Sequence, residues 1–204
     1  MEQGQARANL IIDFDRDFGG GVPLLAASGS ESALESYLAV IPGKQLAAIY
    51  DKWGPRLLEA NVRSFLQARG KVNQGIRNTI RDEPHMFFSY NNGLSATADA
   101  IEVEQTDLGL RLVRADNLQI VNGGQTTASL HAARKAFTEQ LERVHVQMKL
   151  TIVPREQSEL VVPRISEYAN SQNKVNAADF FANHPFHIRT EELSRKVLAR
   201  GEDG

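Results

Sequence analysis

The chain has 204 residues, of which 42% are hydrophobic and 24% are charged, and its formal net charge is −2 at pH 7. This balance gives no electrostatic reason for the whole chain to bind nucleic acid, and the absence of cysteine excludes disulfides, thiol nucleophiles and thiolate metal sites. No apolar run reaches membrane-spanning length and the N-terminus lacks a signal-peptide core, so we expect a soluble, cytoplasmic protein with no membrane partner.

The first quarter of the chain predicts two short apolar segments and two helices. Residues 9–15 alternate well enough for a strand, and a second short apolar run covers residues 22–27. A helix is predicted at residues 30–38, where a serine provides the N-cap, and another at residues 44–53, before a Gly-Pro pair breaks the chain.

The next segment, residues 55–81, is the clearly basic part of the sequence. A helix is predicted at residues 73–81, capped by an asparagine and ended before Pro84. The single acid of the segment, Glu59, stands against six cations, which are Arg56, Arg63, Arg69, Lys71, Arg77 and Arg81.

The centre of the chain predicts several strands and one long helix. Residues 86–90 are typical of a strand, and Asn-Gly between this run and the next apolar run is the strongest short-range signal for a β-hairpin. Further strands are predicted at residues 94–103, 108–113, 118–121 and 145–153, and a helix at residues 126–141.

The last part of the chain predicts helices only, at residues 163–170, 177–181 and 185–197. Strands and helices are mixed along the chain, with a strand-rich centre and a helical tail. We therefore predict an α+β fold with a mixed central sheet, a strand–glycine turn–helix core and a helical C-terminal part.

The most informative stretch is residues 118–130, where an apolar run ends in Asn-Gly-Gly-Gln-Thr-Thr and a helix-forming run follows. Gly123 and Gly124 allow a ligand to approach the backbone, while unpaired N–H groups and the helix dipole favour an anion there. The lysine of a P-loop is absent. The residues leave equally open an ordinary strand-to-helix turn capped by Thr126.

Two other segments share the amide-rich character of this turn. Residues 90–93 fit a plain hairpin turn, and residues 168–174 fit the end of a helix, although Asn91 is not required by turn chemistry. Amides donate and accept hydrogen bonds without titrating, so they suit recognition of a phosphate, ribose or base edge better than acid–base catalysis. The amide side chains are Asn91, Asn92, Asn122, Gln125, Asn170, Gln172 and Asn173.

A metal-dependent nuclease is a less favoured interpretation. Asp116 together with Gln147-Met148-Lys149 imitates a restriction-type acid and acid-X-Lys pattern, but Gln147 replaces the second acid, and Lys149 fits the solvent side of a strand. The histidines have no zinc-site spacing. No metal site is predicted, and the catalytic residues are unknown, with Asp116 and Asp179 as the remaining candidates.

Several separated motifs, taken in order, resemble the AIPR family of abortive infection and phage resistance proteins. The resemblance divides the chain into a strand/helix segment at residues 1–41 and an AIPR-like core at residues 42–204. Family members are longer, which implies that this chain is a fragment truncated at its C-terminus. The matching stretches are residues 57–66, 72–80, 87–94, 118–130, 165–175 and 179–180.

A weaker similarity links the chain to ParB and sulfiredoxin-like domains. It rests on Asn61-Val62-Arg63 and on the strand–Asn-Gly-Gly-Gln-Thr–helix segment. In that group a glycine-rich turn binds nucleotide phosphates and a basic residue follows the glycines. Thr126 and Thr127 stand in that place here, so an arginine such as Arg63 would have to supply the charge.

These resemblances imply an antiphage defence protein, and our leading hypothesis is that it binds a nucleotide or a nucleic-acid phosphate. The alternative is a non-catalytic sensor or adaptor that binds a phage or host protein. Any enzyme activity would be phosphoanhydride or phosphodiester hydrolysis with Mg²⁺, and a homodimer is left open. The expected ligand-binding residues are Asn122, Gly123, Gly124, Gln125 and Thr126 for the phosphate, Arg63 and Arg77 for its charge, Asn91, Asn92, Asn170 and Asn173 for the sugar or base, and Asn61 in addition.

Overall fold

The computed structural model describes residues 9–27, 33–59, 62 and 70–171. The chain divides into two compact units, residues 1–169 and residues 170–204. The fold described below is that of the first unit.

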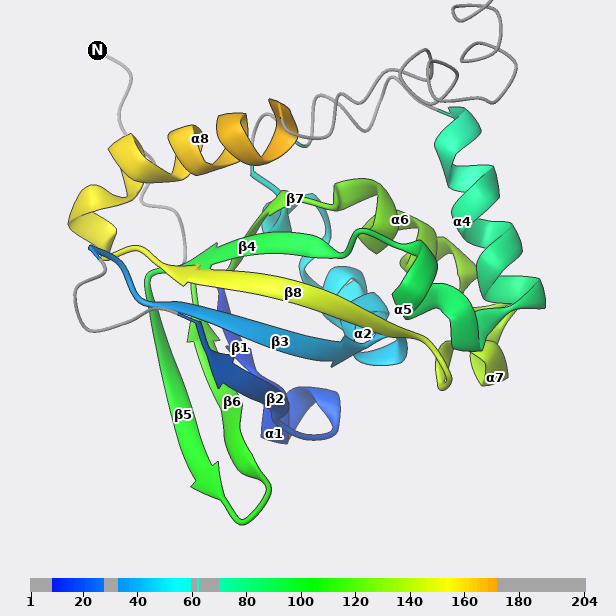
Figure 1. Cartoon of the computed structure of the whole chain (residues 1–204), viewed down its shortest axis with the longest axis horizontal. Coiled ribbons are helices and arrows are strands. Elements are labelled where there is room, and N and C mark those ends of the chain that lie inside the picture. The colour runs from blue at the N-terminus through cyan, green and yellow to red at the C-terminus, as the bar shows by residue number, and fades with distance from the viewer. Residues whose placement is uncertain (1–8, 28–32, 60–61, 63–69, 172–204) are drawn as a thin grey trace, which may run out of the picture. The chain divides into compact units, whose positions relative to one another are not determined.

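Eight strands of the described residues form a single sheet (Figure 1). Their order is β1-β6-β2-β3-β8-β4-β7, and β5 also pairs with β6. Every pair is antiparallel except β4 with β8, so the sheet is mixed. The strands are β1 Ile11–Asp13, β2 Val22–Ala26, β3 Ser36–Pro42, β4 Leu94–Ala98, β5 Ala100–Thr106, β6 Gly109–Asp116, β7 Gln119–Asn122 and β8 His145–Ile152.

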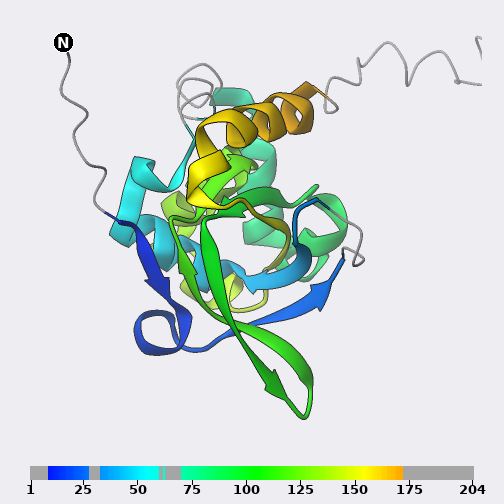
Figure 2. The ribbon, with the colours of Figure 1, turned by 90° about the vertical axis from the view of Figure 1, so that its left-hand side faces the viewer.

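Strand β5 forms one edge of this sheet and β7 ends the other side. The residues of β6 that pair with β1 and β2 also pair with β5. Because one edge of a strand holds a single ladder, β5 must lie on the opposite edge of β6 from β1 and β2. Figure 2 shows β5 and β6 as a long hairpin that turns at its free end.

Nine helical segments of the described residues surround the sheet. Helices α2, α4 and α6 contact one another in pairs, α2 with α6 and α4 with α6. None of the helices in the described part is long and apolar enough to cross a membrane. The segments are α1 Phe14–Phe18, α2 Gly43–Trp53, η1 Gly54–Leu57, α4 Gly70–Asp82, η2 Pro84–Met86, α5 Phe87–Tyr90, α6 Gly124–Ala133, α7 Thr138–Leu141 and α8 Arg155–Ser171.

The main core lies between the sheet and the helices α2, α4 and α6. Alternate residues of the central strands are buried in it, as the period of two in a β-strand requires. This burial of apolar surface is the main force that holds the helices on this face. Among the contributing side chains are Ile41, Ile49, Ile80, Leu112, Ile120, Leu130, Met148 and Leu150.

Helix α8 buries a second, smaller apolar cluster. Val162 of α8 packs with Val121 of β7 and with Val153, which follows β8. Pro163 lies inside the helix, where a proline removes one backbone hydrogen bond. Helix α8 is therefore held by packing at Val162 and by the polar contacts of its last turns, described below.

The predicted α+β fold with a mixed sheet is confirmed, as are the helix at residues 44–53 and the strand at residues 145–153. The strand–glycine turn–helix core is present as β7 and α6. The helices predicted at residues 177–181 and 185–197 lie outside the described residues.

The helix predicted at residues 30–38 is wrong where the structure describes it. Residues 36–42 form β3, which pairs along its whole length with β8. Tyr37, Ala39 and Ile41 point to one face, and Ala39 and Ile41 are buried in the core. Cross-strand pairing and burial thus override the weak helical pattern.

The strand predicted at residues 86–90, and the hairpin that would follow it, are also wrong. Residues 87–90 form the single-turn helix α5, in which the Asn91 N–H donates to the Phe87 carbonyl over 3.0 Å. Asn91, Asn92 and Gly93 then connect a helix to β4. Burial of Phe87 fixes this turn, whereas the aromatic composition of the run is typical of a strand.

Several predicted boundaries also change. The strand at residues 9–15 ends at Asp13, whose carboxylate accepts the Arg16 N–H and caps α1. The run at residues 94–103 belongs to two strands, β4 and β5, and the helix at residues 126–141 is divided into α6 and α7.

Candidate functional site

The candidate site is the turn between β7 and α6, where two glycine-containing loops touch. Gly123 is the N-cap of α6 and has φ +92°. A Cβ atom at this position would lie 2.5 Å from the Leu94 Cβ and 2.9 Å from the Gly93 carbonyl oxygen. Glycine is therefore required at residue 123 both by its backbone conformation and by close packing.

The Asn91–Gly93 loop is held against α6 by Asn91. Its Oδ1 accepts the Gly93 N–H over 2.9 Å, and its Nδ2 lies 3.1 Å from the Thr126 hydroxyl. Gly93 has φ +72°, and a Cβ there would lie 2.5 Å from the Gln147 carbonyl oxygen. The side chain of Gln147 in turn donates to the Asn92 carbonyl over 3.1 Å.

The first turn of α6 offers unused hydrogen-bond donors. Thr127 donates its N–H to the Gly123 carbonyl over 3.1 Å, whereas no acceptor within the described ranges takes the N–H groups of residues 124–126. No side chain caps this terminus, because the Thr126 hydroxyl is bonded to Asn91. Thr126, which the sequence left open as a possible cap, does not cap the helix, and the donors stay available together with the positive end of the helix dipole.

Gln125 adds a further donor beside these N–H groups. Its residue is partly buried, and its Nε2 atom is fully buried with no hydrogen-bond partner among the described residues. Leaving a buried amide donor unpaired costs about 1–3 kcal/mol, so a partner at this position would be favoured. Both the helix terminus and this side chain therefore favour an acceptor.

A β-bulge directs Asn122 toward α8. The β4–β7 register pairs Ser95 with Asn122 and Ala96 with Ile120, which leaves Val121 as the extra residue. The Asn122 Nδ2 donates to the Ala169 carbonyl over 2.7 Å. This bond ties the end of β7 to α8.

The buried pair Glu59 and Ser166, which no predicted site contains, lies beside the same strand β7. Glu59 is 8% exposed, and its Oε2 accepts the Ser166 hydroxyl over 3.1 Å. Its backbone N–H donates to the Ile120 carbonyl over 3.0 Å. The sequence signal is an acid directly after two leucines. An acid in an apolar run is expected to be buried only with hydrogen-bond or charge partners, so its position indicates a partner elsewhere in the chain.

The predicted amide residues therefore divide into two groups. The side chains of Asn91 and Asn122 are committed to hydrogen bonds within the fold, while the exposed side chain of Asn92 has no partner among the residues described. Asn170 is exposed near the end of α8. Asn61, Arg63, Asn173 and Asp179 lie outside the described residues.

The predicted cation Arg77 is not brought to the turn. Its guanidinium lies 5.8 Å from the ring centroid of Phe137, which follows the C-terminal end of α6. Since a helix rises about 1.5 Å per residue, the whole length of α6 separates this contact from Gly123.

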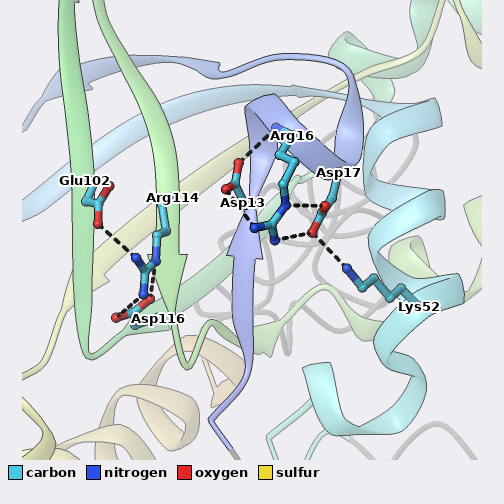
Figure 3. A network of polar contacts seen from close by, with 7 residues as sticks. All are labelled: Asp13, Arg16, Asp17, Lys52, Glu102, Arg114 and Asp116. Carbon is cyan, nitrogen blue, oxygen red and sulfur yellow. Dashed lines mark hydrogen bonds and ion pairs between the residues drawn. The ribbon is translucent and has the colours of Figure 1, made fainter.

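The nuclease pattern is not assembled either. Asp116 lies on β6, where the Arg114 Nε donates to it over 2.9 Å (Figure 3). Lys149 lies on β8, and β2 and β3 lie between these two strands. Within the described part of the chain, no three acidic or histidine side chains come together as a metal site would need.

A second charged network lies around α1, outside the turn (Figure 3). Asp17 accepts hydrogen bonds from Arg16 over 2.8 Å and from Lys52 over 2.8 Å. The Arg16 hydrogen bond, followed by the Lys52 bond, holds the pKa of Asp17 well below its usual range. These contacts tie α1 to α2 and explain the charges of this region structurally.

A comparison with protein families covers the segment that forms this site. The AIPR protein family model matches residues 58–203, more than half of the chain, and includes β7, α6 and the Asn91 loop. No curated protein and no solved structure matches the chain. The family match supports a role related to abortive infection and phage defence. The chain belongs to the AIPR family.

Proposed function

We propose that this protein binds the phosphate group of a nucleotide or of a nucleic acid at the turn formed by residues 122–126. The observation that carries the proposal is the first turn of α6, where three successive N–H groups have no acceptor among the described residues. A helix N-terminus that combines free N–H groups with the positive end of the dipole favours an anion.

The proposal gives Gln125 a direct role. Its unpaired Nε2 atom lies on the residue that also contributes a free backbone N–H, and the proposal assigns both groups to one phosphate. Asn92 is the amide left to contact the sugar or base, because Asn91 and Asn122 hold the loops in place. Because hydrogen bonds of Asn91 and Asn122 already hold these loops, we expect a small cost in ordering entropy when a ligand binds.

In this proposal the negative charge of the ligand accepts hydrogen bonds from neutral donors and forms no ion pair with a described residue. Arg77 contacts Phe137 at the other end of α6, and the remaining candidate, Arg63, lies outside the described residues. Hydrogen bonds from neutral donors are weaker than those from a cation. We therefore expect modest affinity, of roughly micromolar to millimolar dissociation constant for a small ligand.

Calorimetric titration of the chain with nucleoside triphosphates, and separately with single-stranded DNA, tests the proposal. The informative variant is Gln125→Glu, which keeps the side-chain shape and adds a negative charge beside the phosphate. We expect binding about tenfold weaker or lost, because like charges repel in a partly buried site. Gln157→Glu, which adds the same charge to an exposed position of α8, is the matched control.

Two outcomes would reject phosphate binding at this turn. One is no heat with any nucleotide or with DNA. The other is equal affinity of Gln125→Glu and Gln157→Glu, with both variants folded by circular dichroism. Phage plaque counts with the same pair of variants connect the site to the defence role, and protection should fall only for Gln125→Glu.

A further inference from the structure

The sheet ends in an edge strand that nothing in the described part of the chain covers. Strand β5 pairs with β6 along its whole length, and none of its residues is buried. Its other edge has no backbone partner within the residues described. An unpaired edge of this kind presents alternating N–H and C=O groups that can accept a further strand.

The devices by which proteins usually protect such an edge are few here. Strand β5 contains no proline and no lysine. The register shift opposite residues 102–103 leaves its extra residue, Val113, on β6, so β5 itself keeps a regular pleat. Leu108, in the turn between β5 and β6, is fully exposed.

The charge of this edge is acidic. Arg114 lies between Glu102 at 3.1 Å and Asp116 at 2.9 Å, and Arg111 lies between Glu104 at 2.6 Å and Asp15 at 3.0 Å. Each guanidinium is therefore shared by two carboxylates, and negative charge is in excess.

The excess negative charge also faces outward. The side chains of Glu102 and Glu104 are 64% and 52% exposed, against 33% and 34% for the arginines that they contact. Glu102 and Glu104 are two residues apart on a regular strand, so they share one face, while Val103, which is 43% exposed, points to the other.

We infer that β5 is a docking edge for an extended basic segment of a partner protein, which adds a strand to the sheet. Backbone hydrogen bonds supply the pairing, and side chains at alternate positions supply the selectivity. The segment that fits has lysine or arginine at positions two apart, facing Glu102 and Glu104, with a small apolar residue between them against Val103.

The same charges argue against two other occupants. A second copy that paired through its own β5 would bring Glu102 and Glu104 of both chains together, and like charges across a strand pair destabilise it. A nucleic acid would be repelled by the excess carboxylates. The edge lies on the opposite side of the sheet from β7, so this inference does not depend on phosphate binding at the turn.

A fluorescein-labelled peptide, Thr-Lys-Val-Lys-Val-Lys-Thr, is the probe, and anisotropy measures its binding to the chain. A second peptide with N-methylated amides on alternate residues keeps the charges but cannot complete a ladder. We expect saturable binding of the first peptide and binding about tenfold weaker for the second, since backbone pairing carries the affinity. Amide exchange in residues 100–106 should slow in the first complex only.

The variant Glu102→Gln/Glu104→Gln removes the outward charge and keeps the side-chain shape. It should weaken the peptide about tenfold, whereas Glu156→Gln/Glu159→Gln on the exposed face of α8 should leave it unchanged. Equal binding of the two peptides, equal binding to both double variants, or no saturable binding would overturn the inference. So would a concentration-dependent dimer of the chain alone with slowed exchange in β5.

Discussion

The two sides of the sheet are held together by opposite chemistry. At the β7–α6 turn, glycines allow backbone to touch backbone, and neutral amides bond the loops. At the β5–β6 hairpin, shared ion pairs connect the exposed strand β5 to β6. What each region leaves unused therefore differs, since the turn has spare hydrogen-bond donors and the hairpin has spare acceptors. The first suits an anion and the second suits a cation.

The largest expected effect comes from replacing a glycine in the turn. Gly123→Ala would place a Cβ 2.5 Å from the Leu94 Cβ in a backbone with φ +92°. We expect a loss of about 3 kcal/mol in the free energy of unfolding, from strain and displaced packing together. Urea denaturation followed by circular dichroism measures it.

The matched control is Gly109→Ala at the start of β6. Its φ of +113° is also unfavourable for alanine, but a Cβ there meets nothing within 4 Å. We expect Gly109→Ala to lower the free energy of unfolding by about 1 kcal/mol, because only the unfavourable backbone conformation contributes. An equal loss of stability in both variants would show that close packing at residue 123 adds nothing to the cost of its backbone conformation.

The next effect in size comes from the hydrogen bonds by which Asn91 holds its loop against α6. Asn91→Ala removes the acceptor of the Gly93 N–H and the partner of Thr126, and we expect a loss of about 1–2 kcal/mol from these partly buried bonds. Asn92→Ala removes an exposed side chain with no partner among the described residues, so stability should change by less than about 0.5 kcal/mol. Thermal unfolding of the two variants distinguishes Asn91, which holds the loop, from Asn92, which is proposed to contact the ligand. A large loss of stability for Asn92→Ala would show that Asn92 also holds the fold.

The ion pairs of the hairpin should contribute less. Arg114→Gln breaks an exposed contact to Glu102 and a partly buried contact to Asp116, and we expect a loss of about 0.5 kcal/mol in the free energy of unfolding at low salt, falling toward zero at high salt. Denaturation at two salt concentrations measures this. Asn91→Ala should show no comparable salt dependence, because its bonds join neutral groups. A salt-independent Arg114 effect would mean that packing of the side chain, and not charge, holds the hairpin.

The smallest expected effect is the pH dependence of α1. Hydrogen bonds from Arg16 and Lys52 lower the pKa of Asp17 below its ordinary value of 3.8. A lowered pKa in the folded state means that this stabilisation is present above pH 3.8 and is lost as the pH falls through the folded value. The protection of the α1 amides, measured as their exchange rates relative to the intrinsic rates at the same pH, should therefore fall on acidification, and Asp17→Asn should remove the change. An equal fall in α6 would show a global transition instead.

The sequence determined the parts of this protein that depend on local chemistry. The glycine turn, the helix after it and the alternating strand β8 were predicted because glycine pairs, helix termini and period-two burial are local signals. The amide-rich segments are local signals of the same kind. The charge of Arg77 is visible in the sequence, whereas its distance from the turn is not.

Only the tertiary structure decided which of these groups are used up by the fold. Asn91 and Asn122 hold loops and a helix through bonds to residues 35 and 47 positions away, and such long-range pairs leave no local pattern. The same applies to β3, which is a strand because β8 lies beside it, and to Glu59, which reaches Ser166 across 107 positions. Local propensity sets the candidates, but burial and non-local hydrogen bonds choose among them, because each buried polar group must find its partner wherever the chain brings one.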